Sequence, residues 1–293
     1  MPELPEVEVV RQGLEAQLLH KQIEGVEIYT PHITQPDPES WSEALTGQKL
    51  MALERRAKYL ILRLSQDCLL VHLRMTGQML LQANQSPQAE PREALVLPFT
   101  YYRKPVLDLP DKHTHLRLGF SGGIQLYFRD IRKFGRVEKL LPEALTEHPG
   151  LAKLGVEPLG SEYTWKHFQG LLQGQRAIKA FLLDQTRIAG LGNIYVDEAL
   201  FEAGIRPQRP VASLRPAEAK RLFAAIPKIL EKAIASGGTT LKDYLHPDGK
   251  GGEHQEELKV YGRGKMPCLR CGQLLEKTVV AQRGTHFCAH CQQ

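Results

Sequence analysis

The sequence contains no apolar run that is long enough to cross a bilayer. Its longest apolar stretches, such as LILRL and CLLVHL, are short or interrupted by charge, whereas a transmembrane helix needs roughly 20 consecutive apolar residues. The N-terminus also lacks the basic segment and the following hydrophobic segment of a secretory signal. We therefore expect a cytoplasmic protein that has no membrane partner.

Cysteine is nearly absent outside the last 26 residues. Cys68 alone lies elsewhere, within an apolar run, and we expect it to be a reduced core residue. The others form CLRC and CAHC, sixteen residues apart, and are Cys268, Cys271, Cys288 and Cys291. In a chain without export signals this spacing favours zinc over disulfides. Four thiolates would fill the shell of one structural Zn²⁺, which makes His286 and His290 unneeded as alternative ligands.

Acidic residues do not outnumber basic residues in this sequence. Lysine and arginine number 38 against 33 aspartates and glutamates, giving a net charge of +5. Residues 259–293 hold six basic side chains and one acid, Glu276. Basic charge gathered on a short tail is typical of proteins that bind nucleic acid. A metal-stabilised ribbon there would present Arg283 to a phosphate.

The first 140 residues are predicted to form a β-sandwich with an opening helix. Apolar residues recur at helical spacing in the first 18 residues, at Val7, Val10, Leu14 and Leu18. Short apolar and β-branched segments follow, separated by glycine, proline or aspartate. They are GVEIYT, KLMALERR, YLILRL, CLLVHLRM, LRLGF, GIQLYF and RVEKLL. Residues 82–112 contain five prolines and predict an irregular insertion.

The chain after residue 140 is predicted to be helical as far as the cysteine-rich tail. Three prolines punctuate residues 141–162, which we interpret as a linker. Helices are expected at about 163–173, 177–185, 193–203 and 215–235. A polar, glycine-rich loop is expected at 246–257. With the β-sandwich, these segments predict an α+β protein.

The stretch GLGNIYVDEALF predicts an anion site. Two glycines lead into Asn193 and an amphipathic helix. A glycine-rich turn at a helix N-terminus presents free backbone N–H groups and the positive end of the dipole to an anion. A simple helix cap is the alternative, but the basic ribbon makes phosphate binding the favoured interpretation.

The opening stretch MPELPEVE has two interpretations. Proline and acidic residues suit the first turn of a helix. Removal of Met1 would instead leave Pro2 with a free secondary amine, partly unprotonated near neutral pH, and such an amine forms an iminium with an aldehyde. From this stretch alone the helix start is favoured, because amine catalysts are rare.

Eight motifs in one order resemble the formamidopyrimidine-DNA glycosylases, bacterial-type DNA repair enzymes. They are PELPEVE (2–8), RRAKYL (55–60), HLRMTG (72–77), DIRKFG (130–135), GLGNIYVDEALF (190–201), GGTTLKDY (237–244), VYGR (260–263) and the paired CxxC motifs. The resemblance is weakest at 82–112. It implies an N-terminal β-sandwich over 1–140, a linker over 141–162, a helix–two-turns–helix domain over 163–257 and a zinc finger over 258–293. It also implies excision of 8-oxoguanine and formamidopyrimidines from double-stranded DNA, then strand cleavage by β,δ-elimination at the abasic site.

The resemblance implies the catalytic residues as well. Pro2 is then the nucleophile at C1′ and forms an iminium with the opened sugar, which favours the second interpretation of the opening stretch. Glu3 is the acid/base at the sugar ring oxygen, and Glu6 helps to position the site unless it is an exposed acid in the first helical turn. Lys58 donates a proton and contacts phosphate in β-elimination, with a solvated strand-edge lysine as the alternative. Arg283 matches the donor for δ-elimination, and we interpret it as a phosphate clamp because arginine rarely loses a proton.

Three side chains match the family's wedge, which fills the space that an everted base leaves. They are Met75, Arg132 and Phe134, although Met75 and Phe134 taken alone would be ordinary core residues. The complete set favours oxidised purines over the pyrimidine lesions of endonuclease VIII, a relative that is the first alternative.

Further DNA contacts are implied at motif positions. Phosphate contacts are expected from His72, His113, Arg132 and Asn193. Lys242 and the loop to about 257 resemble the segment that caps the everted lesion. Some members have a DNA-contacting lysine where this chain has Gln175. The contact is then either shifted to Arg176 beside it, which we count among the DNA-binding residues, or lost.

A second alternative is a non-catalytic DNA-binding protein with the same scaffold. Intact Pro2, Glu3 and Lys58 argue against it. No feature of the sequence indicates oligomerisation, so we expect a monomer that associates with the nucleoid through its DNA binding.

Overall fold

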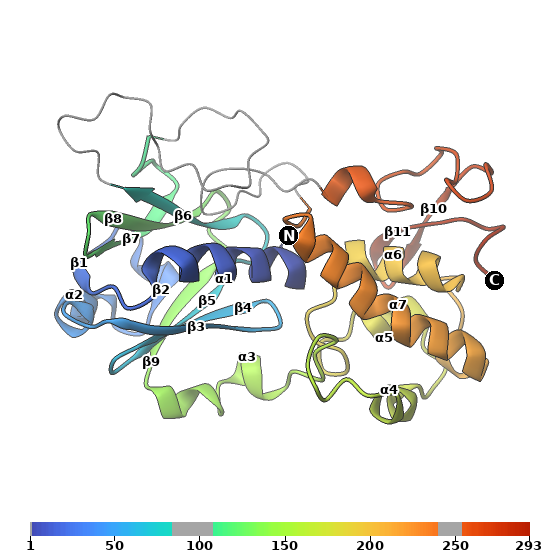
Figure 1. Ribbon diagram of the computed structural model, residues 1–293, viewed down its shortest axis with the longest axis horizontal. Coiled ribbons are helices and arrows are strands. Elements are labelled where there is room, and N and C mark those ends of the chain that lie inside the picture. The colour runs from blue at the N-terminus through green and yellow to red at the C-terminus, as the bar shows by residue number, and fades with distance from the viewer. Residues whose placement is uncertain (1, 84–107, 240–253) are drawn as a thin grey trace. The chain divides into compact units, whose positions relative to one another are not determined.

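The structure, a computed structural model, describes residues 2–83, 108–239 and 254–293 (Figure 1). Most of the expected insertion at 82–112, most of the expected loop at 246–257, and Lys242 lie outside the described residues. The chain divides into two compact units. The described parts of Met1–Leu151 and Ser236–Gln255 form the first unit, and those of Ala152–Ala235 and Glu256–Gln293 form the second.

The first unit opens with helix α1 (Leu4–Leu18). Its predicted apolar stripe is fully buried, at Val7, Val10, Leu14 and Leu18. Glu3 is the N-cap, Pro5 lies in the first turn, and Pro2 precedes the cap. The opening stretch does start a helix, as the first interpretation states, but Pro2 lies before the cap, and Pro5 is the proline whose missing N–H suits the first turn.

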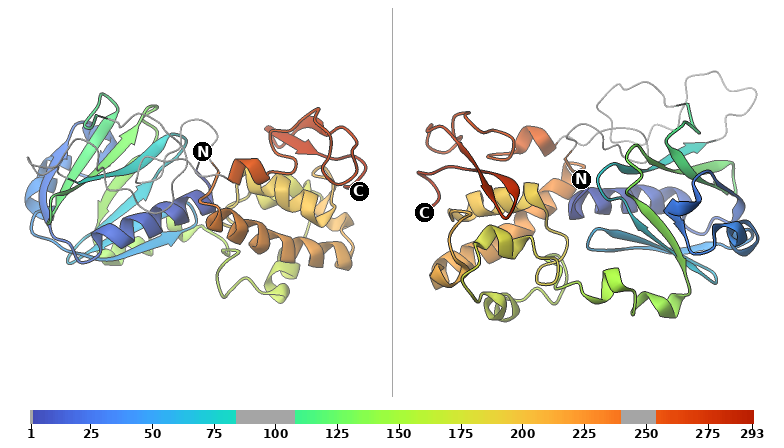
Figure 2. Two further views of the ribbon diagram at one scale, coloured as in Figure 1. Left: turned by 45° about the horizontal axis from the view of Figure 1, so that its top comes forward. Right: turned by 180° about the vertical axis from the view of Figure 1, so that it is seen from behind.

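Two sheets enclose the core of the first unit (Figures 1 and 2). One has the strand order β1-β7-β8-β6 and the other β2-β9-β5-β4-β3. The first sheet consists of β1 (Ile23–Ile28), β6 (Gly77–Ala83), β7 (Thr114–Phe120) and β8 (Ile124–Asp130). The second consists of β2 (Thr34–Gln35), β3 (Leu50–Arg56), β4 (Tyr59–Leu64), β5 (Cys68–His72) and β9 (Arg136–Leu140). Apolar side chains from both sheets and from α1 fill one buried cluster, which confirms the predicted β-sandwich.

Strand β6 is absent from the predicted set. GQMLLQA follows CLLVHLRM after a turn without proline, and its Gly77 belongs to the strand. That glycine is needed because a Cβ there would lie 2.4 Å from the Leu73 carbonyl oxygen. The short helices α2 (Trp41–Leu45) and α3 (Pro149–Ala152) are also absent from the predictions. Cys68 is free and 1% exposed, which confirms the predicted reduced core residue.

The second unit holds four helices at the predicted places. They are α4 (Trp165–Leu171), α5 (Ile178–Leu182), α6 (Asn193–Ala203) and α7 (Pro216–Ala235). A hairpin of β10 (Glu276–Val280) and β11 (Arg283–Phe287) lies between the two cysteine pairs, as expected. Phe201 of α6 packs with Val260, Leu275 and the cysteines in one apolar cluster. The hairpin and the helices therefore share a core.

Short 3₁₀ helices complete the described secondary structure. They are η1 (Pro31–Ile33), η2 (Pro38–Ser40), η3 (Pro142–Leu145), η4 (Val211–Ser213) and η5 (His254–Glu257). None of the described helices combines the length and hydrophobicity that a membrane span requires.

Candidate active site and zinc centre

The first candidate site lies at the start of α1. Pro2 is buried directly before the helix cap, and Glu3 is 2% exposed. Glu6 accepts a hydrogen bond from the Glu3 backbone N–H over 2.8 Å, which is the return half of a capping box. Glu6 therefore fixes the backbone that joins the Pro2 nitrogen and the Glu3 carboxyl group to the helix.

Glu6 also binds the segment that follows α7. Its Oε1 accepts a hydrogen bond from the Thr239 N–H over 2.8 Å. Gly238 has a φ of +76°, and a Cβ there would lie 3.1 Å from Glu6 Oε1. The interpretation of Glu6 as an exposed acid is wrong, because its buried carboxylate joins two segments that are 233 residues apart in sequence.

Lys58 lies in the two-residue turn between β3 and β4 and is 8% exposed. Ala57, the other turn residue, has a φ of +53°. Arg55 holds the turn, because its guanidinium donates to the Ala57 carbonyl over 3.2 Å and to Glu8 of α1 over 2.8 Å. Burial disfavours the Glu8 carboxylate, but Arg11 and Arg55 outweigh it and hold the pKa of Glu8 below its ordinary value. The interpretation of Lys58 as a solvated strand-edge lysine is wrong, because the residue is buried in this turn.

His72, at the end of β5, is a neutral imidazole. Burial, with smaller contributions from the charges of Arg74 and Lys58, lowers the pKa of His72 to about 3. Its Nδ1 accepts a hydrogen bond from the Arg74 N–H over 2.9 Å, so the ring proton lies on Nε2. The Tyr59 ring packs edge-on against it, with centroids 4.5 Å apart. His72 can thus donate a hydrogen bond to DNA without adding charge.

The three predicted wedge residues lie on two loops that contact each other. Met75 is in the loop between β5 and β6, and Arg132 and Phe134 are in the loop between β8 and β9. Arg132 Nη1 lies 3.2 Å from Met75 Sδ, and its guanidinium lies 4.6 Å from the centre of the Phe134 ring. Met75 is 44% exposed and Phe134 is 48% exposed. Neither is a core residue, so the structure brings the wedge set together at the surface.

His113 lies in the turn directly before β7, the strand that follows the expected insertion. Its backbone carbonyl accepts from the Asp130 N–H over 2.9 Å, and its own N–H donates to Asp111 over 3.1 Å. The side chain is partly exposed. The backbone of this expected DNA contact is therefore fixed while its imidazole reaches solvent.

In the second unit, Asn193 is the first residue of α6 and follows the Gly192 N-cap. Its Nδ2 donates to the Gly284 carbonyl over 2.9 Å. Its Oδ1 is buried and has no hydrogen-bond partner among the described residues. Asn193 is therefore anchored to the zinc-finger hairpin beside Arg283.

Arg283 is exposed and begins β11. The two residues before it, Ala281 and Gln282, have φ values of +51° and +58°. Positive φ at both central residues is the geometry of a tight hairpin turn whose twist matches the strands. The hairpin tip thus presents Arg283 to solvent, as the phosphate-clamp hypothesis requires.

The segment between α4 and α6 contains Gln175, at the position where some family members have a DNA-contacting lysine. Gln175 is exposed. Arg176 is exposed at the side chain and pairs with Asp184 over 2.8 Å. A DNA contact from Arg176 would compete with this ion pair.

Three charged residues without a predicted role, two of them within the GLGNIYVDEALF motif, fix the cysteine-rich tail to the helices of the second unit. Lys179 and Asp197 form a fully buried ion pair. Glu198 accepts backbone hydrogen bonds from Lys259, Val260 and Tyr261, each over 2.9 Å. Burial raises the pKa of Glu198, although these N–H donors favour its charged form. The adjacent acids within an apolar helical stretch were the available sequence signal.

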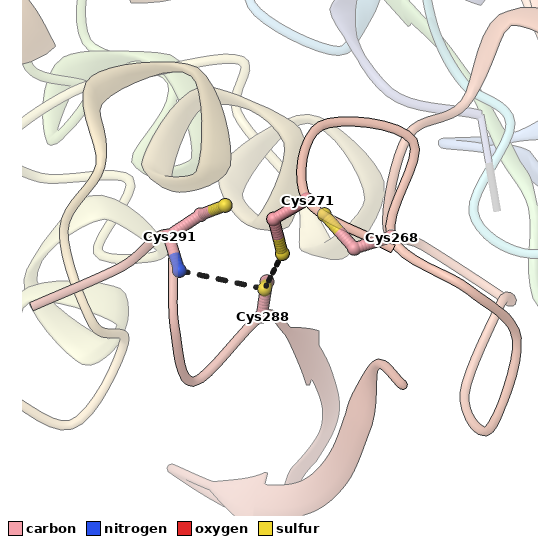
Figure 3. Close-up of side chains that lie close together, drawn as sticks. All are labelled: Cys268, Cys271, Cys288 and Cys291. Atoms are coloured by element: carbon pink, nitrogen blue, oxygen red, sulfur yellow. Dashed lines mark hydrogen bonds between the residues drawn. The ribbon is translucent and has the colours of Figure 1, made fainter. Parts of the chain in front are cut away.

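The four cysteines of the tail surround one point (Figure 3). Their sulfur atoms lie within 4.8 Å of one another, and the sulfurs of Cys271 and Cys288 are 3.5 Å apart. That separation excludes a bond of about 2.05 Å and suits thiolates at about 2.3 Å from a shared zinc ion. The Arg270 N–H also donates to Cys268 Sγ, and the Cys291 N–H to Cys288 Sγ, both over 3.4 Å. This donor set fits one structural Zn²⁺.

Three family profiles match successive parts of the chain. The formamidopyrimidine-DNA glycosylase N-terminal domain matches residues 1–137, and the formamidopyrimidine-DNA glycosylase H2TH domain matches 154–244. The zinc finger found in FPG and IleRS matches 267–293. The formamidopyrimidine-DNA glycosylase of Enterococcus faecalis is 42% identical over 295 residues, which cover 100% of this chain and 98% of the relative. The chain belongs to the formamidopyrimidine-DNA glycosylase family.

Solved structures of the family also match. The Lactococcus lactis Fpg in complex with abasic-site DNA has a TM-score of 0.84 and 35% identity over 100% of both chains. The same protein in complex with N7-benzyl-Fapy-dG DNA has the same TM-score, identity and coverage. The predicted α+β fold, the DNA glycosylase/AP lyase class and the single structural zinc are confirmed. The endonuclease VIII alternative is not favoured. The roles of individual site residues stay predictions.

Proposed function

We propose that this chain excises 8-oxoguanine and formamidopyrimidines from double-stranded DNA and then cleaves the strand at the abasic site. The main support is the start of α1, where Pro2 lies outside the helix beside the buried Glu3 and Glu6. A proline at this point, freed of Met1, is a secondary amine fixed by a helix cap. The DNA complexes of the Lactococcus lactis protein support the substrate class.

In the first step, the Pro2 nitrogen attacks C1′ of the damaged nucleotide, and the bond from C1′ to the base breaks. The base leaves with the bonding electrons and takes up the proton that the Pro2 nitrogen loses after the attack. Glu3 then protonates the sugar ring oxygen, the ring opens, and the Pro2 nitrogen forms an iminium with C1′. Positioned acid–base groups typically contribute about 10²–10⁴ in rate.

In the second step, the iminium acts as an electron sink for strand cleavage. Loss of a proton from C2′ breaks the bond to the 3′ phosphate, and a second elimination breaks the bond to the 5′ phosphate. Lys58 supplies positive charge and a proton near the first leaving group. Arg283 stabilises phosphate charge in the second elimination, where its permanent cation suits it as a clamp.

Eversion of the base needs contacts on both sides of the lesion. Met75, Arg132 and Phe134 enter the duplex, which costs a few kcal/mol of unstacking. His72, His113 and Asn193 contact phosphates. Arg176 is a further phosphate contact, and Lys242 belongs to the segment that covers the everted base.

Zinc, when bound, stabilises the fold of the finger and takes no part in bond breaking, because four thiolates leave no open position. Cys268, Cys271, Cys288 and Cys291 would hold it. We also propose a domain division into 1–140, 141–162, 163–257 and 258–293, which the ranges of the three family profiles support. We further propose that the protein is a cytoplasmic monomer that associates with the nucleoid through its DNA binding.

Single-turnover excision from matched duplexes tests the proposal. One duplex contains 8-oxoguanine, one contains 5-hydroxycytosine, and one is undamaged, each with borohydride present in a parallel reaction. We expect the purine lesion to be removed at least about tenfold faster, with covalent trapping on damaged DNA only. Faster removal of the pyrimidine would favour endonuclease VIII specificity, and binding without excision or trapping would favour the non-catalytic alternative.

A further inference from the structure

Asp130, the last residue of β8, is fully buried and accepts three hydrogen bonds at its carboxylate. Its Oδ1 accepts from the Thr76 hydroxyl over 2.5 Å and from the Arg132 N–H over 3.1 Å. Its Oδ2 accepts from the Gly135 N–H over 2.7 Å. A buried carboxylate is stable only when its oxygens are satisfied in this way.

These donors belong to the two wedge loops. Thr76 directly follows Met75 in one loop, and Arg132 and Gly135 flank Phe134 in the other. The Asp130 side chain therefore joins the Thr76 hydroxyl of one loop to two backbone N–H groups of the other. We name Thr76, Asp130 and the N–H groups of Arg132 and Gly135 the Asp130 network.

Both wedge loops contain backbone strain next to their wedge residues. Arg74, before Met75, has a φ of +52°, and Lys133, between Arg132 and Phe134, has a φ of +58°. A positive φ costs energy in any residue other than glycine, and it persists only where the surrounding structure fixes the backbone. The bonds to Asp130 supply that fixation.

Close packing adds a second constraint at Gly135. A Cβ at this position would lie 2.5 Å from Cζ of Phe128 and 3.1 Å from Asp130 Oδ2. The absence of a side chain thus lets the loop approach the carboxylate. Asp130 also reaches a third DNA-facing segment, because its N–H donates to the His113 carbonyl.

A buried histidine completes the surroundings of Asp130. The ring of His115 bonds the Asp130 carbonyl through Nε2 over 2.8 Å and the Thr30 hydroxyl through Nδ1 over 2.8 Å. A carbonyl only accepts, so the ring proton lies on Nε2. The backbone of Asp130 is therefore fixed independently of its carboxylate.

We infer that Thr76 and Asp130 are positioning residues that hold Met75, Arg132 and Phe134 as one rigid wedge for insertion into the duplex. This inference rests on the wedge role in the proposed function. Neither residue contacts the reacting atoms in this account. Their effect is on the fraction of enzyme whose wedge is ready to enter DNA.

The test uses Thr76→Val, which removes the hydroxyl and keeps the branched shape. Thr76→Ser restores the hydroxyl, and Thr34→Val is a matched control at another buried threonine of the same sandwich. Steady-state and single-turnover kinetics are measured on 8-oxoguanine opposite cytosine and opposite adenine. Met75→Ala, alone and combined with Thr76→Val, completes a double-mutant cycle.

We expect Thr76→Val to lower kcat about tenfold with little change in KM, because the variant lacks a hydrogen bond to a charged group and the wedge enters the duplex after initial binding. Preference for the opposite base should fall, because Arg132, the wedge residue whose family role is to bond the orphaned base opposite the everted nucleotide, loses its fixed position. Thr76→Ser and Thr34→Val should stay within about twofold of the unmodified protein. In the Met75→Ala background, the effect of Thr76→Val should shrink.

Unchanged kcat and opposite-base preference in Thr76→Val would overturn the inference, provided that Met75→Ala is impaired. Equal losses in Thr76→Val and Thr34→Val would also overturn it, since general destabilisation would then explain both. If Met75→Ala itself is unimpaired while borohydride trapping persists, the wedge role fails and the catalytic proposal survives. If Thr76→Val does not fold, full activity in Asp130→Asn would contradict the inference by itself.

Discussion

Lys179 and Asp197 form an ion pair of 2.7 Å in which neither side chain reaches solvent. The same Lys179 ammonium donates to the Gly284 carbonyl over 3.1 Å, and the second Asp197 oxygen accepts from the His286 N–H over 2.9 Å. Lys179 and Asp197 thus each bind the backbone of β11 in addition to binding each other. The pair fixes the strand that begins with Arg283 to helices α5 and α6.

Replacing Lys179 with Met should destabilise the second unit by about 3–5 kcal/mol, because it leaves Asp197 buried without a cation. The double variant Lys179→Met, Asp197→Leu should lose less, since no charge remains unpaired. Both variants should shift strand cleavage from δ- towards β-elimination products, because the Gly284 carbonyl next to Arg283 loses one of its two donors and keeps only Asn193 Nδ2. Thermal unfolding and gel analysis of the cleaved strand measure the two effects. Equal stability of the single and double variants would contradict this account.

Replacing Glu3 with Gln should separate binding from excision. The amide keeps the size of the buried side chain but cannot supply the proton to the ring oxygen, so we expect at least about a hundredfold loss of excision. DNA affinity should change little. Glu15→Gln, at a partly exposed acid of the same helix, is the control and should behave as the unmodified protein. Single-turnover excision and fluorescence anisotropy give the two readouts, and rapid excision by Glu3→Gln would remove Glu3 from the mechanism.

The neutral state of His72 predicts a specific pH dependence of stability. Because the pKa falls to about 3 in the folded protein, the unfolded chain binds more protons below its ordinary value of about 6.5. Stability should therefore be fully present above pH 6.5 and decline towards pH 3, by at most about 1.4 kcal/mol per pH unit from this group. His72→Gln should remove that part of the slope, whereas His32→Gln should keep it.

Tryptophan fluorescence can follow this unfolding in the first unit alone. The chain has two tryptophans, Trp41 and Trp165, and Trp165→Phe leaves Trp41 as the reporter of the sandwich. Urea unfolding at pH 7.5 and pH 5 then gives the slope. The same slope in His72→Gln as in the parent would show that His72 is not held neutral.

Loss of zinc should unfold the finger and weaken DNA binding. Cys268→Ser should release the ion, because ligand loss and ribbon folding are coupled, and affinity for damaged duplex should fall at least about tenfold. Cys68→Ala is the matched control, since Cys68 is buried in a separate apolar cluster of the first unit with Ile61, Leu70 and Leu145, and this variant should keep one zinc ion per chain. Metal analysis and anisotropy measure both quantities. Retention of a full equivalent of zinc by Cys268→Ser would contradict four-cysteine ligation.

The spacing of apolar residues predicted most of the helices and strands because it records which faces are buried. The helix start at Leu4 was harder to predict, because both Pro2 and Pro5 fit a first turn. Only the observed cap at Glu3 shows that Pro5 is the proline inside the helix. Burial of Glu6 depends on Thr239, and no local pattern shows a partner that far along the chain.

The exposed wedge was identified by its family motifs, but its support was not. Asp130 begins DIRKFG, and its three donors lie in two motifs whose contact arises only in the folded sandwich. Lys179 and Asp197 likewise stand in ordinary helical positions in the sequence. Pairing between distant charged residues is a tertiary property that periodicity does not encode.

Mapping the covalent adduct tests the central claim most directly. The protein is trapped with borohydride on an 8-oxoguanine duplex, digested, and sequenced by mass spectrometry, with Lys58→Ala as a parallel sample. We predict that Met1 is absent, that the sugar remnant is attached to the Pro2 nitrogen, and that the adduct also forms in Lys58→Ala. Attachment to a lysine side chain, or an adduct on a chain that keeps Met1, would contradict the account.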